Sequence, residues 1–448
     1  MKKNDEFILP VTDLTDLGSG FGRAPDGSAV FVPGTVPGDR VLCHLIKVNK
    51  QYAVGKLLRV ETPSPYRTAP ECPVFGSCGG CSLCHITPDY EREMKKRFVE
   101  AALRKEGLTV PVRDVRSTGR RDRYRNKVQL PLSPDGKIGF FAPHSHRVIE
   151  LPDGDCRLQH PAFTPVIRTL GEWVKESGIS CYDEKTGKGL LRHLCLRTNA
   201  DGSELLLILV LNGRALPRKA ERALLDALSV HPAVCSVWLS ENTENTNVIL
   251  GEHFTHLSGA PYITDALLGR SFAISPRSFY QVNHDGCELL YATAIEKAAP
   301  FLRGGKKLVD LFCGIGTVGI CMAADIGDCE LLGVEIIPEA VENARENAVR
   351  NGFGDRAAFL CGDANDPALD GADVVVVDPP RAGLEPRLIT RLAALRPEAI
   401  LYISCNPATL ARDLRLFAGH GYTADSVQPV DMFPCTGHVE TVVLMSKV

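Results

Sequence analysis

The sequence predicts a three-part α/β protein: a small β-barrel, a β-rich middle and a C-terminal doubly wound parallel sheet. In the C-terminal part, helical patterns alternate with apolar strand patterns at 307–312, 330–334, 372–377 and 399–404. Short apolar runs between Gly and Pro clusters dominate the N-terminus, and residues 128 to about 265 are strand-rich. These three textures divide the chain at 1–62, 63–265 and 266–448.

The composition is that of an ordinary folded protein, with 44% hydrophobic and 23% charged residues among 448. The N-terminus has no apolar signal region, and no run is long enough to span a bilayer. We therefore expect a cytoplasmic protein without membrane contact, and a monomer is favoured. The net charge of −3 gives no general sign of nucleic-acid binding, so such binding must depend on local patches.

The first 62 residues read as a small five-stranded barrel of the oligonucleotide-binding type. Apolar runs at 29–32, 40–46 and 53–60 are separated by turn residues. This pattern predicts the shape and leaves open whether the barrel binds RNA.

Four thiols lie close together after a proline-rich hinge. Cys72, Cys78, Cys81 and Cys84 surround two glycines that let the backbone bend. The four thiols could form a closed zinc site, or three of them could bind an iron–sulfur cluster with a fourth thiolate from elsewhere. Cys156 is the candidate for that remote ligand. Reduced thiols in a loop are the alternative to both sites.

A helix is predicted over 87–107, and a basic stretch follows it. Seven Arg or Lys residues lie between positions 113 and 127, opposed by two aspartates. The stretch is either a solvated loop or a contact for RNA phosphates, and its neighbours favour the second. Within the β-rich middle we expect one helix, near 215–228.

The segment 307–319 predicts a strand, a tight turn and a helix start. Gly314, Gly316 and Gly319 have the G-x-G-x-x-G spacing, and Glu335 closes the next apolar run. A nucleoside cofactor fits there, because glycines allow close approach and a carboxylate can accept hydrogen bonds from ribose hydroxyls. The same pattern occurs in NAD enzymes, in S-adenosyl-L-methionine (SAM) enzymes and in turns that bind nothing.

Two residues with chemical potential end neighbouring strands. Asp378 precedes two prolines, and Cys405 precedes Asn406 and Pro407, which form a good helix start. A thiol before a helix N-terminus can have its pKa lowered by the helix dipole and act as a nucleophile. A structural cysteine at a strand end is the alternative. The last segments lack an intervening helix and predict a closing hairpin.

Several segments match one known family. They are Phe279-Tyr280-Gln281-Val282-Asn283, DLFCGIGT, DPPRAGL, YISCNPATLARDL and DMFPCTGHVETVVLM, with an N-terminal FVPGTVPGDRV and the cluster CPVFGSCGGC. Together they resemble the SAM-dependent RNA uracil-C5 methyltransferases, in particular the TRAM-containing iron–sulfur subgroup that methylates 23S ribosomal RNA. The resemblance implies a Rossmann-like methyltransferase domain, an OB-like TRAM barrel that binds RNA, and a middle domain with a [4Fe–4S] cluster.

The resemblance also implies individual roles. The cluster ligands would be Cys72, Cys78, Cys81 and Cys156, and SAM would be surrounded by Gln281, Phe312, Glu335 and Asp378. Cys405 would be the nucleophile and Glu440 the general base. Two positions depart from the family: Cys84 replaces a usual glutamine and competes as fourth ligand, and Thr317 replaces a usual asparagine, so we expect no cofactor contact from it.

These roles define a covalent mechanism. Addition of the Cys405 thiolate to C6 of uracil makes C5 nucleophilic enough to take a methyl group, and Glu440 then removes the C5 proton. The target base must be unstacked. Alternatives are methylation of a tRNA uridine, methylation of an exocyclic amine held by the Asp-Pro-Pro loop, and an RNA-binding iron–sulfur protein without methyl transfer.

Overall fold

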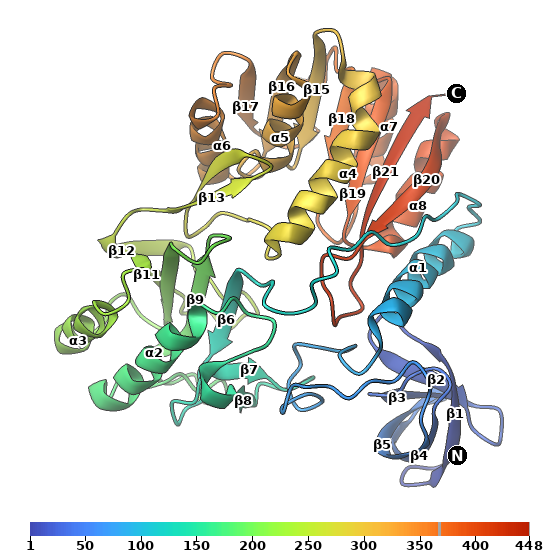
Figure 1. Cartoon of the computed structure of the whole chain (residues 1–448), viewed down its shortest axis with the longest axis vertical. Coiled ribbons are helices and arrows are strands. Elements are labelled where there is room, and N and C mark those ends of the chain that lie inside the picture. Colours follow the sequence, from blue (N-terminus) through green and yellow to red (C-terminus); the bar gives the residue numbers. More distant parts are fainter. Residues whose placement is uncertain (366–368, 448) are drawn as a thin grey trace.

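The computed structural model describes residues 1–365 and 369–447, which form a barrel, a β-rich middle and a large α/β sheet (Figure 1). The five-stranded N-terminal barrel is confirmed: its strands close in the order β1-β2-β3-β5-β4. Alternate residues such as Val30 and Val32 fill its interior with Leu9 and Val41. The strands are β1 (Glu6–Leu14), β2 (Ser19–Arg23), β3 (Ala29–Pro33), β4 (Arg40–Val48) and β5 (Tyr52–Thr62).

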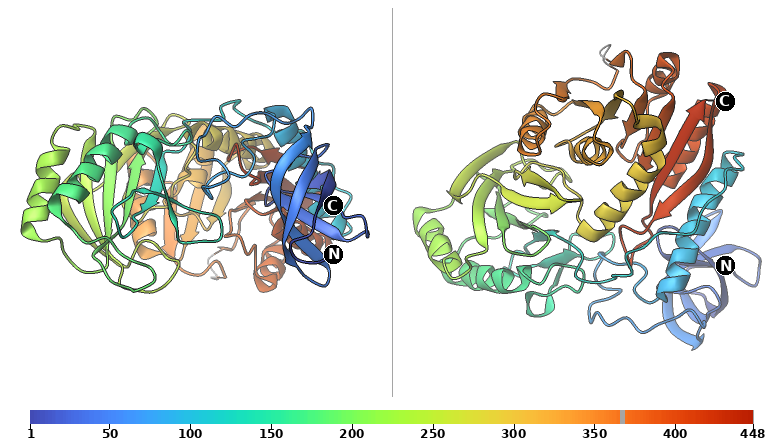
Figure 2. Two further views of the ribbon diagram at one scale, coloured as in Figure 1. Left: turned by 90° about the horizontal axis from the view of Figure 1, so that it is seen from below. Right: turned by 45° about the horizontal axis from the view of Figure 1, so that its top comes forward.

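Helix α1 (Pro88–Lys105) connects the barrel to the rest of the chain. Thr87 precedes it and Pro88 occupies its first position, as the sequence predicts. Residues 63–87, which we call the thiol loop, connect the last strand of the barrel to this helix. Figure 2 shows the barrel and α1 from two further sides.

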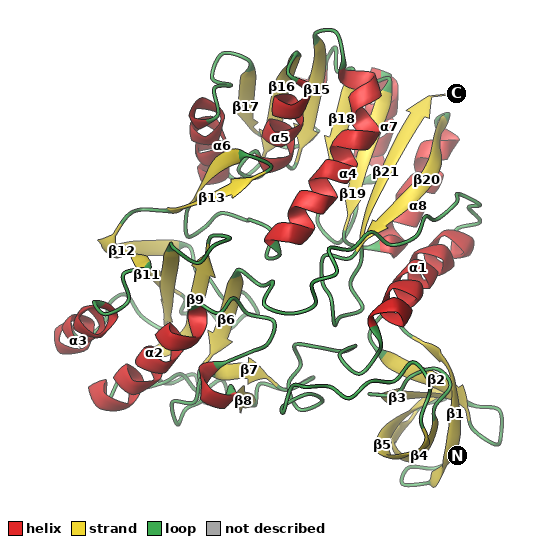
Figure 3. Ribbon diagram, viewed as in Figure 1, coloured by secondary structure: helices red, strands yellow, loops and turns green. Residues whose placement is uncertain are grey.

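The middle is a five-stranded sheet with helices on one face (Figure 3). Its order is β12 (His253–Gly259), β11 (Val234–Glu241), β10 (Leu205–Leu211), β9 (Leu191–Thr198) and β6 (Lys127–Pro131). A small hairpin, β7 (Gly139–Phe141) and β8 (Val148–Glu150), precedes the one-turn helix η1 (Pro152–Gly154).

The expectation of a single helix in the middle is wrong. Besides α3 (Arg218–Leu228), the chain forms α2 (Phe163–Ser177), and both pack on the same face of the sheet. The apolar side chains of α2 recur at helical spacing and are buried, among them Val166, Leu170 and Trp173. The periodicity was therefore present in the sequence, although Pro165 and Gly171 weaken it.

The C-terminal part is a seven-stranded sheet in the order β17-β16-β15-β18-β19-β21-β20. The first five strands are parallel, and the closing hairpin β20–β21 is antiparallel, as predicted. The strands are β15 (Lys306–Leu311), β16 (Cys329–Glu335), β17 (Ala357–Cys361), β18 (Val374–Val377), β19 (Ala399–Ser404), β20 (Tyr422–Val430) and β21 (Glu440–Lys447). A hairpin, β13 (Ile263–Leu267) and β14 (Arg270–Ile274), precedes them.

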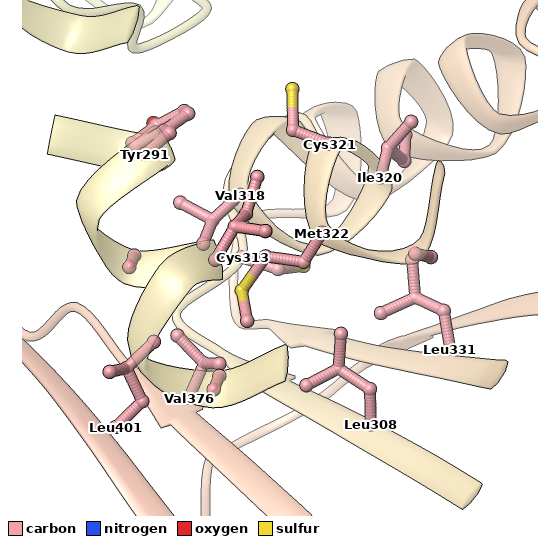
Figure 4. Close-up of a cluster of buried hydrophobic side chains, with 14 of the residues drawn as sticks. Tyr291, Leu308, Cys313, Val318, Ile320, Cys321, Met322, Leu331, Val376 and Leu401 are labelled. Atoms are coloured by element: carbon pink, nitrogen blue, oxygen red, sulfur yellow. The ribbon is translucent and has the colours of Figure 1, made fainter. Parts of the chain in front are cut away.

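Helices cover both faces of this sheet. On one face lie α4 (His284–Leu302), α5 (Thr317–Ile326) and α6 (Pro338–Arg350), and on the other α7 (Pro386–Leu395), α8 (Pro407–Gly419) and α1. Neighbouring residues Leu308 and Val309 belong to opposite cores, because successive strand residues face opposite sides. Figure 4 shows the first core, where Leu308, Val376 and Leu401 face Tyr291 and Met322.

No helix of the described residues is both long and apolar enough to cross a membrane. The division of the chain at 62/63 and 265/266 stays a prediction.

Candidate active site

The carboxyl edge of the large sheet gathers the predicted cofactor residues. Leu311 pairs with Val334 on one side and with Val377 on the other. The next residues along the three strands are Phe312, Glu335 and Asp378, so these three emerge side by side. Strands β15 and β18 flank the point where the chain order reverses, which is where open α/β sheets bind ligands.

The glycine turn at this edge is held by Glu335. Its carboxylate accepts hydrogen bonds from Gly314 N (3.1 Å) and Ile337 N (3.0 Å). Phe312 has φ +62°, a left-handed conformation that is costly for a bulky residue and that recurs at ligand sites. Gly316, at φ +81°, starts helix α5. The turn thus leads into the N-terminus of α5, where unpaired backbone N–H groups can bind a ligand.

Sequence reasoning missed Asp310, which lies below this turn. The side chain is buried, its Oδ2 accepts a hydrogen bond from Gly319 N (2.9 Å), and its Oδ1 has no partner among the described residues. Burial raises its pKa to about 8, and the charges of Asp378 and Glu335 act in the same direction. An acidic residue inside the apolar run LVDLF was the available signal.

Gln281 lies in the segment Phe279–Asn283, which directly precedes helix α4. Gln281 is buried, and its backbone carbonyl accepts a hydrogen bond from Asn126 Nδ2 (3.0 Å). Asn283 caps helix α4 by accepting from Gly286 N (3.0 Å), while its Nδ2 donates to Met432 O (2.9 Å). The motif therefore joins the middle of the chain to the loop that precedes Glu440.

Cys405 and Glu440 face each other across two antiparallel strands. Ser404 of β19 pairs with Thr441 of β21, and Thr441 Oγ1 donates to Ser404 O (3.0 Å). Continuing this register by one residue sets Cys405 opposite Glu440. Glu440 is 4% exposed and Cys405 is half-buried, so a thiol and a carboxyl group share one partly desolvated space.

The electrostatics of this pair differ from the sequence-based prediction. Burial, and then the carboxylates of Glu440 and Asp378, raise the pKa of Cys405 to about 11, while Arg381 opposes them. The expected lowering by the helix dipole is therefore overturned, because burial and the charges of Glu440 and Asp378 raise the pKa instead. Burial also raises the pKa of Glu440 to about 8, with Asp378 adding to the shift, and burial raises that of Asp378 to about 7.

Arg381 is the second residue that sequence reasoning missed. It follows Asp378 in the proline loop, and its carbonyl accepts hydrogen bonds from Asn406 Nδ2 (3.0 Å) and Thr409 Oγ1 (3.3 Å). Its positive charge acts on both Cys405 and Glu440. The arginine in DPPRAGL was the signal.

The thiols separate into two groups. A cavity of about 600 Å³ is lined by the four cysteines expected to hold a cluster, Cys72, Cys78, Cys81 and Cys156. Cys84 is absent from that lining and packs against the small core that contains Cys435. The donor set around the cavity therefore matches the first-named ligands, with Cys156 as the distant member.

No three His, Cys, Asp or Glu side chains of the described chain converge closely enough to hold one metal ion. A single zinc ion needs its four sulfurs within about 2.3 Å of one point. In an iron–sulfur cluster each thiolate binds a different iron, so the sulfurs stand around a larger body. Thiols spaced around a cavity fit the second arrangement better than the first.

Most charges of the basic stretch are engaged within the protein. Arg116, Arg120, Arg121 and Arg123 pair with Glu296, Asp285, Glu91 and Asp155 at 2.6–3.2 Å. Four of the seven charges are therefore paired within the protein, and contact of this stretch with RNA phosphates stays a prediction. Arg113 is exposed and has no ion pair among the described residues.

Comparisons with known proteins agree with this architecture. Residues 5–58 match the family profile of the TRAM domain, 278–395 that of the methyltransferase small domain, and 370–448 that of tRNA (Uracil-5-)-methyltransferase. An uncharacterized RNA methyltransferase of Clostridium tetani is 41% identical over the whole chain and 97% of its own length. One of Halalkalibacterium halodurans is 39% identical over 99% of the chain and 98% of its own length.

A solved structure is similar over nearly the whole molecule. The tRNA (uracil-54, C5)-methyltransferase of Pyrococcus abyssi, in complex with S-adenosyl-L-homocysteine, has 29% sequence identity and a TM-score of 0.78. The match covers 98% of this chain and 100% of that protein.

The fold and the matches to known proteins define a SAM-dependent methyltransferase with an N-terminal TRAM barrel. The sequence identity to RNA methyltransferases over the full length of the chain then identifies the family. The chain belongs to the TRAM-containing family of RNA uracil-5-methyltransferases.

Proposed function

We propose that the protein methylates C5 of a specific uridine in 23S ribosomal RNA through a covalent bond between Cys405 and C6. The observation that carries the mechanism is the placement of Cys405 opposite Glu440 at the carboxyl edge of the sheet, where Asp378 also lies. A nucleophile and a proton acceptor on one side of a base are what C5 methylation needs. An exocyclic-amine methyltransferase would have no use for this thiol.

The electron flow follows from these two groups. The Cys405 sulfur bonds to C6 while the C5=C6 electron pair moves toward C5 and O4, which makes C5 nucleophilic. SAM supplies a methyl group activated by its sulfonium charge. Glu440 then takes the C5 proton, the C5=C6 bond reforms, and Cys405 leaves with the electron pair of the C–S bond.

Binding of a cationic cofactor would also lower the pKa of Cys405. At neutral pH only about one thiol in 10⁴ is ionised when the pKa is about 11. A positive charge bound beside Asp378 would offset the carboxylates that raise this pKa, since an opposite charge favours the ionised form. We infer that Gln281, Phe312, Glu335 and Asp378 bind SAM, and that this binding activates Cys405.

We further propose that Cys72, Cys78, Cys81 and Cys156 would hold a [4Fe–4S] cluster. The support is the shared cavity that these four thiols line. Such a cluster would bridge the thiol loop after the barrel and the segment before α2. The three units 1–62, 63–265 and 266–448 would then serve RNA binding, cluster binding and catalysis.

A tRNA uridine is the second candidate substrate. The observation that favours it is the full-length similarity to a tRNA (uracil-54, C5)-methyltransferase. Nucleoside mapping of ribosomal and transfer RNA from cells with and without the gene distinguishes the two. A 5-methyluridine missing only from tRNA would refute the 23S assignment.

The mechanism is tested with two variants and SAM labelled in its methyl group. Glu440→Gln should stall as a covalent complex of protein and methylated RNA, because the C5 proton stays in place. Cys405→Ala should form no complex and transfer no methyl group. Normal turnover by Glu440→Gln, or substantial activity of Cys405→Ala, would contradict the covalent mechanism.

A further inference from the structure

The loop that leads to Glu440 is a meeting point of distant segments. We call residues 431–436, between β20 and β21, the 431–436 loop. Asp431 N donates to Arg116 O (2.8 Å), and Tyr124 OH donates to Pro434 O (3.0 Å). Cys435 O accepts from Ser82 N (3.1 Å) and Leu83 N (2.9 Å) of the thiol loop.

Helix α1 inserts a buried cation into this loop. Lys95 is fully buried, and its Nζ lies 2.6 Å from Asp431 Oδ1, 2.9 Å from Glu91 Oε1 and 3.1 Å from Phe433 O. Figure 1 shows α1 beside β20, the strand that leads into the loop. One ammonium group therefore binds the two ends of a short segment, at Asp431 and Phe433.

Glu91, one turn before Lys95, completes the network. Its Oε1 accepts from Cys435 N (2.7 Å) and its Oε2 from Arg121 Nη2 (2.6 Å). Two cations, Lys95 and Arg121, thus balance two carboxylates, Glu91 and Asp431. Buried charges persist where they are paired and hydrogen-bonded, and such networks favour one geometry more than they add stability.

The loop is held in a conformation that it would not adopt unaided. Cys435 has φ +68°, in the left-handed region that favours glycine. Gly437 approaches the barrel so closely that a Cβ would lie 1.8 Å from Asp16 O. The chain between the network and Glu440 is therefore constrained from both sides.

Glu440 itself lacks such an anchor. Among the hydrogen bonds of the described residues none involves its carboxyl group, and Arg381 acts on it through its charge. The position of the carboxyl group is consequently set by the strand β21 and by the loop before it. A change in the loop would move Glu440 relative to Cys405.

We propose that Lys95 is a positioning residue that holds the 431–436 loop, and through it Glu440, for removal of the C5 proton. The proposal rests on the function proposed above. It predicts a selective defect, because loss of the ammonium group displaces the base and leaves the cofactor edge and Cys405 untouched. Methyl transfer should continue while resolution of the adduct slows.

The test compares Lys95→Met with Lys96→Met. Lys96 is the next residue of α1 and pairs with the exposed Asp114 at 2.7 Å, so it controls for loss of a lysine from the same helix. For Lys95→Met we expect unchanged SAM affinity, kcat lowered by roughly 10- to 100-fold, and accumulation of methylated covalent adduct, since a displacement of about 1 Å costs about 100-fold. Lys96→Met should retain kcat and accumulate no adduct.

A second variant tests the proposal if Lys95→Met does not fold. Asp431→Asn keeps the volume and the acceptor oxygen and removes the charge, and it should show the same adduct at a lower level. Normal adduct turnover in a folded Lys95→Met protein, or in Asp431→Asn if Lys95→Met does not fold, would overturn the proposal. If Glu440→Gln accumulates no adduct either, the covalent mechanism fails, and the role of Lys95 fails with it.

Discussion

The raised pKa of Glu440 predicts the pH dependence of adduct resolution. A general base must be ionised to accept the C5 proton, so the rate of this step should follow the ionised fraction of Glu440. With a pKa of about 8, that fraction is roughly a tenth at pH 7, half at pH 8 and nine tenths at pH 9. A carboxyl group at its ordinary value of 4.5 would be ionised throughout and would give a flat profile.

The assay follows the decay of the labelled, methylated adduct after a jump from about pH 6 to each final pH. We expect the decay rate to rise about tenfold between pH 7 and pH 9, with an apparent pKa near 8. Asp378→Asn should shift the profile to lower pH, because the Asp378 charge adds to the raised pKa of Glu440.

Adduct formation is the internal control. RNA with 5-fluorouridine at the target position has no C5 proton to remove, so its adduct reports only the attack by Cys405. This adduct should form without Glu440 acting as a base, and in Glu440→Gln it should form at least as fast as in the unchanged protein, because the Glu440 charge raises the pKa of Cys405. A decay rate independent of pH between about 6.5 and 9 would refute the assignment of Glu440 as a base with a raised pKa.

Three further predictions concern the cysteines and the basic stretch. Cys78→Ala should lose iron and the brown colour of the anaerobically purified protein, whereas Cys84→Ala should keep both, because Cys78 lines the shared cavity and Cys84 does not. If Cys84→Ala lost iron and Cys156→Ala kept it, Cys84 would be the fourth ligand in place of Cys156. SAM should speed the alkylation of Cys405 by iodoacetamide, whereas S-adenosyl-L-homocysteine, which lacks the sulfonium charge, should not. Peptide mass spectrometry measures the alkylation. Equal effects of the two compounds would contradict activation by the sulfonium charge. Arg113→Gln should lower the slope of log K against log salt concentration for RNA binding by roughly 0.7 to 0.9. Arg121→Gln should leave this slope unchanged and should destabilise the fold by about 1–3 kcal/mol, because it removes a partner of the buried Glu91. An unchanged slope for Arg113→Gln would make this arginine a solvated charge.

Local signals were enough to predict the class of the fold. The alternation of strand and helix patterns predicts the parallel sheet, and Pro338 correctly marks the first residue of α6. The Asn406-Pro407 pair likewise predicts the start of α8, where the Asn406 side chain accepts a hydrogen bond from Ala408 N. These features depend on residues a few positions apart, so the order of amino acids suffices.

The positions of Phe312, Glu335 and Asp378 were also predictable from strand ends. Each follows an apolar run, and parallel strands present their carboxyl ends at one edge. Helix α2 had an equally local signal, and the error there was one of interpretation.

Only the tertiary structure decided the chemistry of the site. The pairing of Cys405 with Glu440 depends on the antiparallel register of β19 and β21, which no local pattern specifies. Burial, together with the charges of Glu440 and Asp378, raises the pKa of Cys405 and reverses the expectation drawn from the helix start alone. The burial of Lys95 against Asp431 joins residues far apart in the chain. Register, burial and charge pairing arise when distant segments meet, and for that physical reason the sequence alone determines the parts of this protein while folding determines how its reactive groups act on one another.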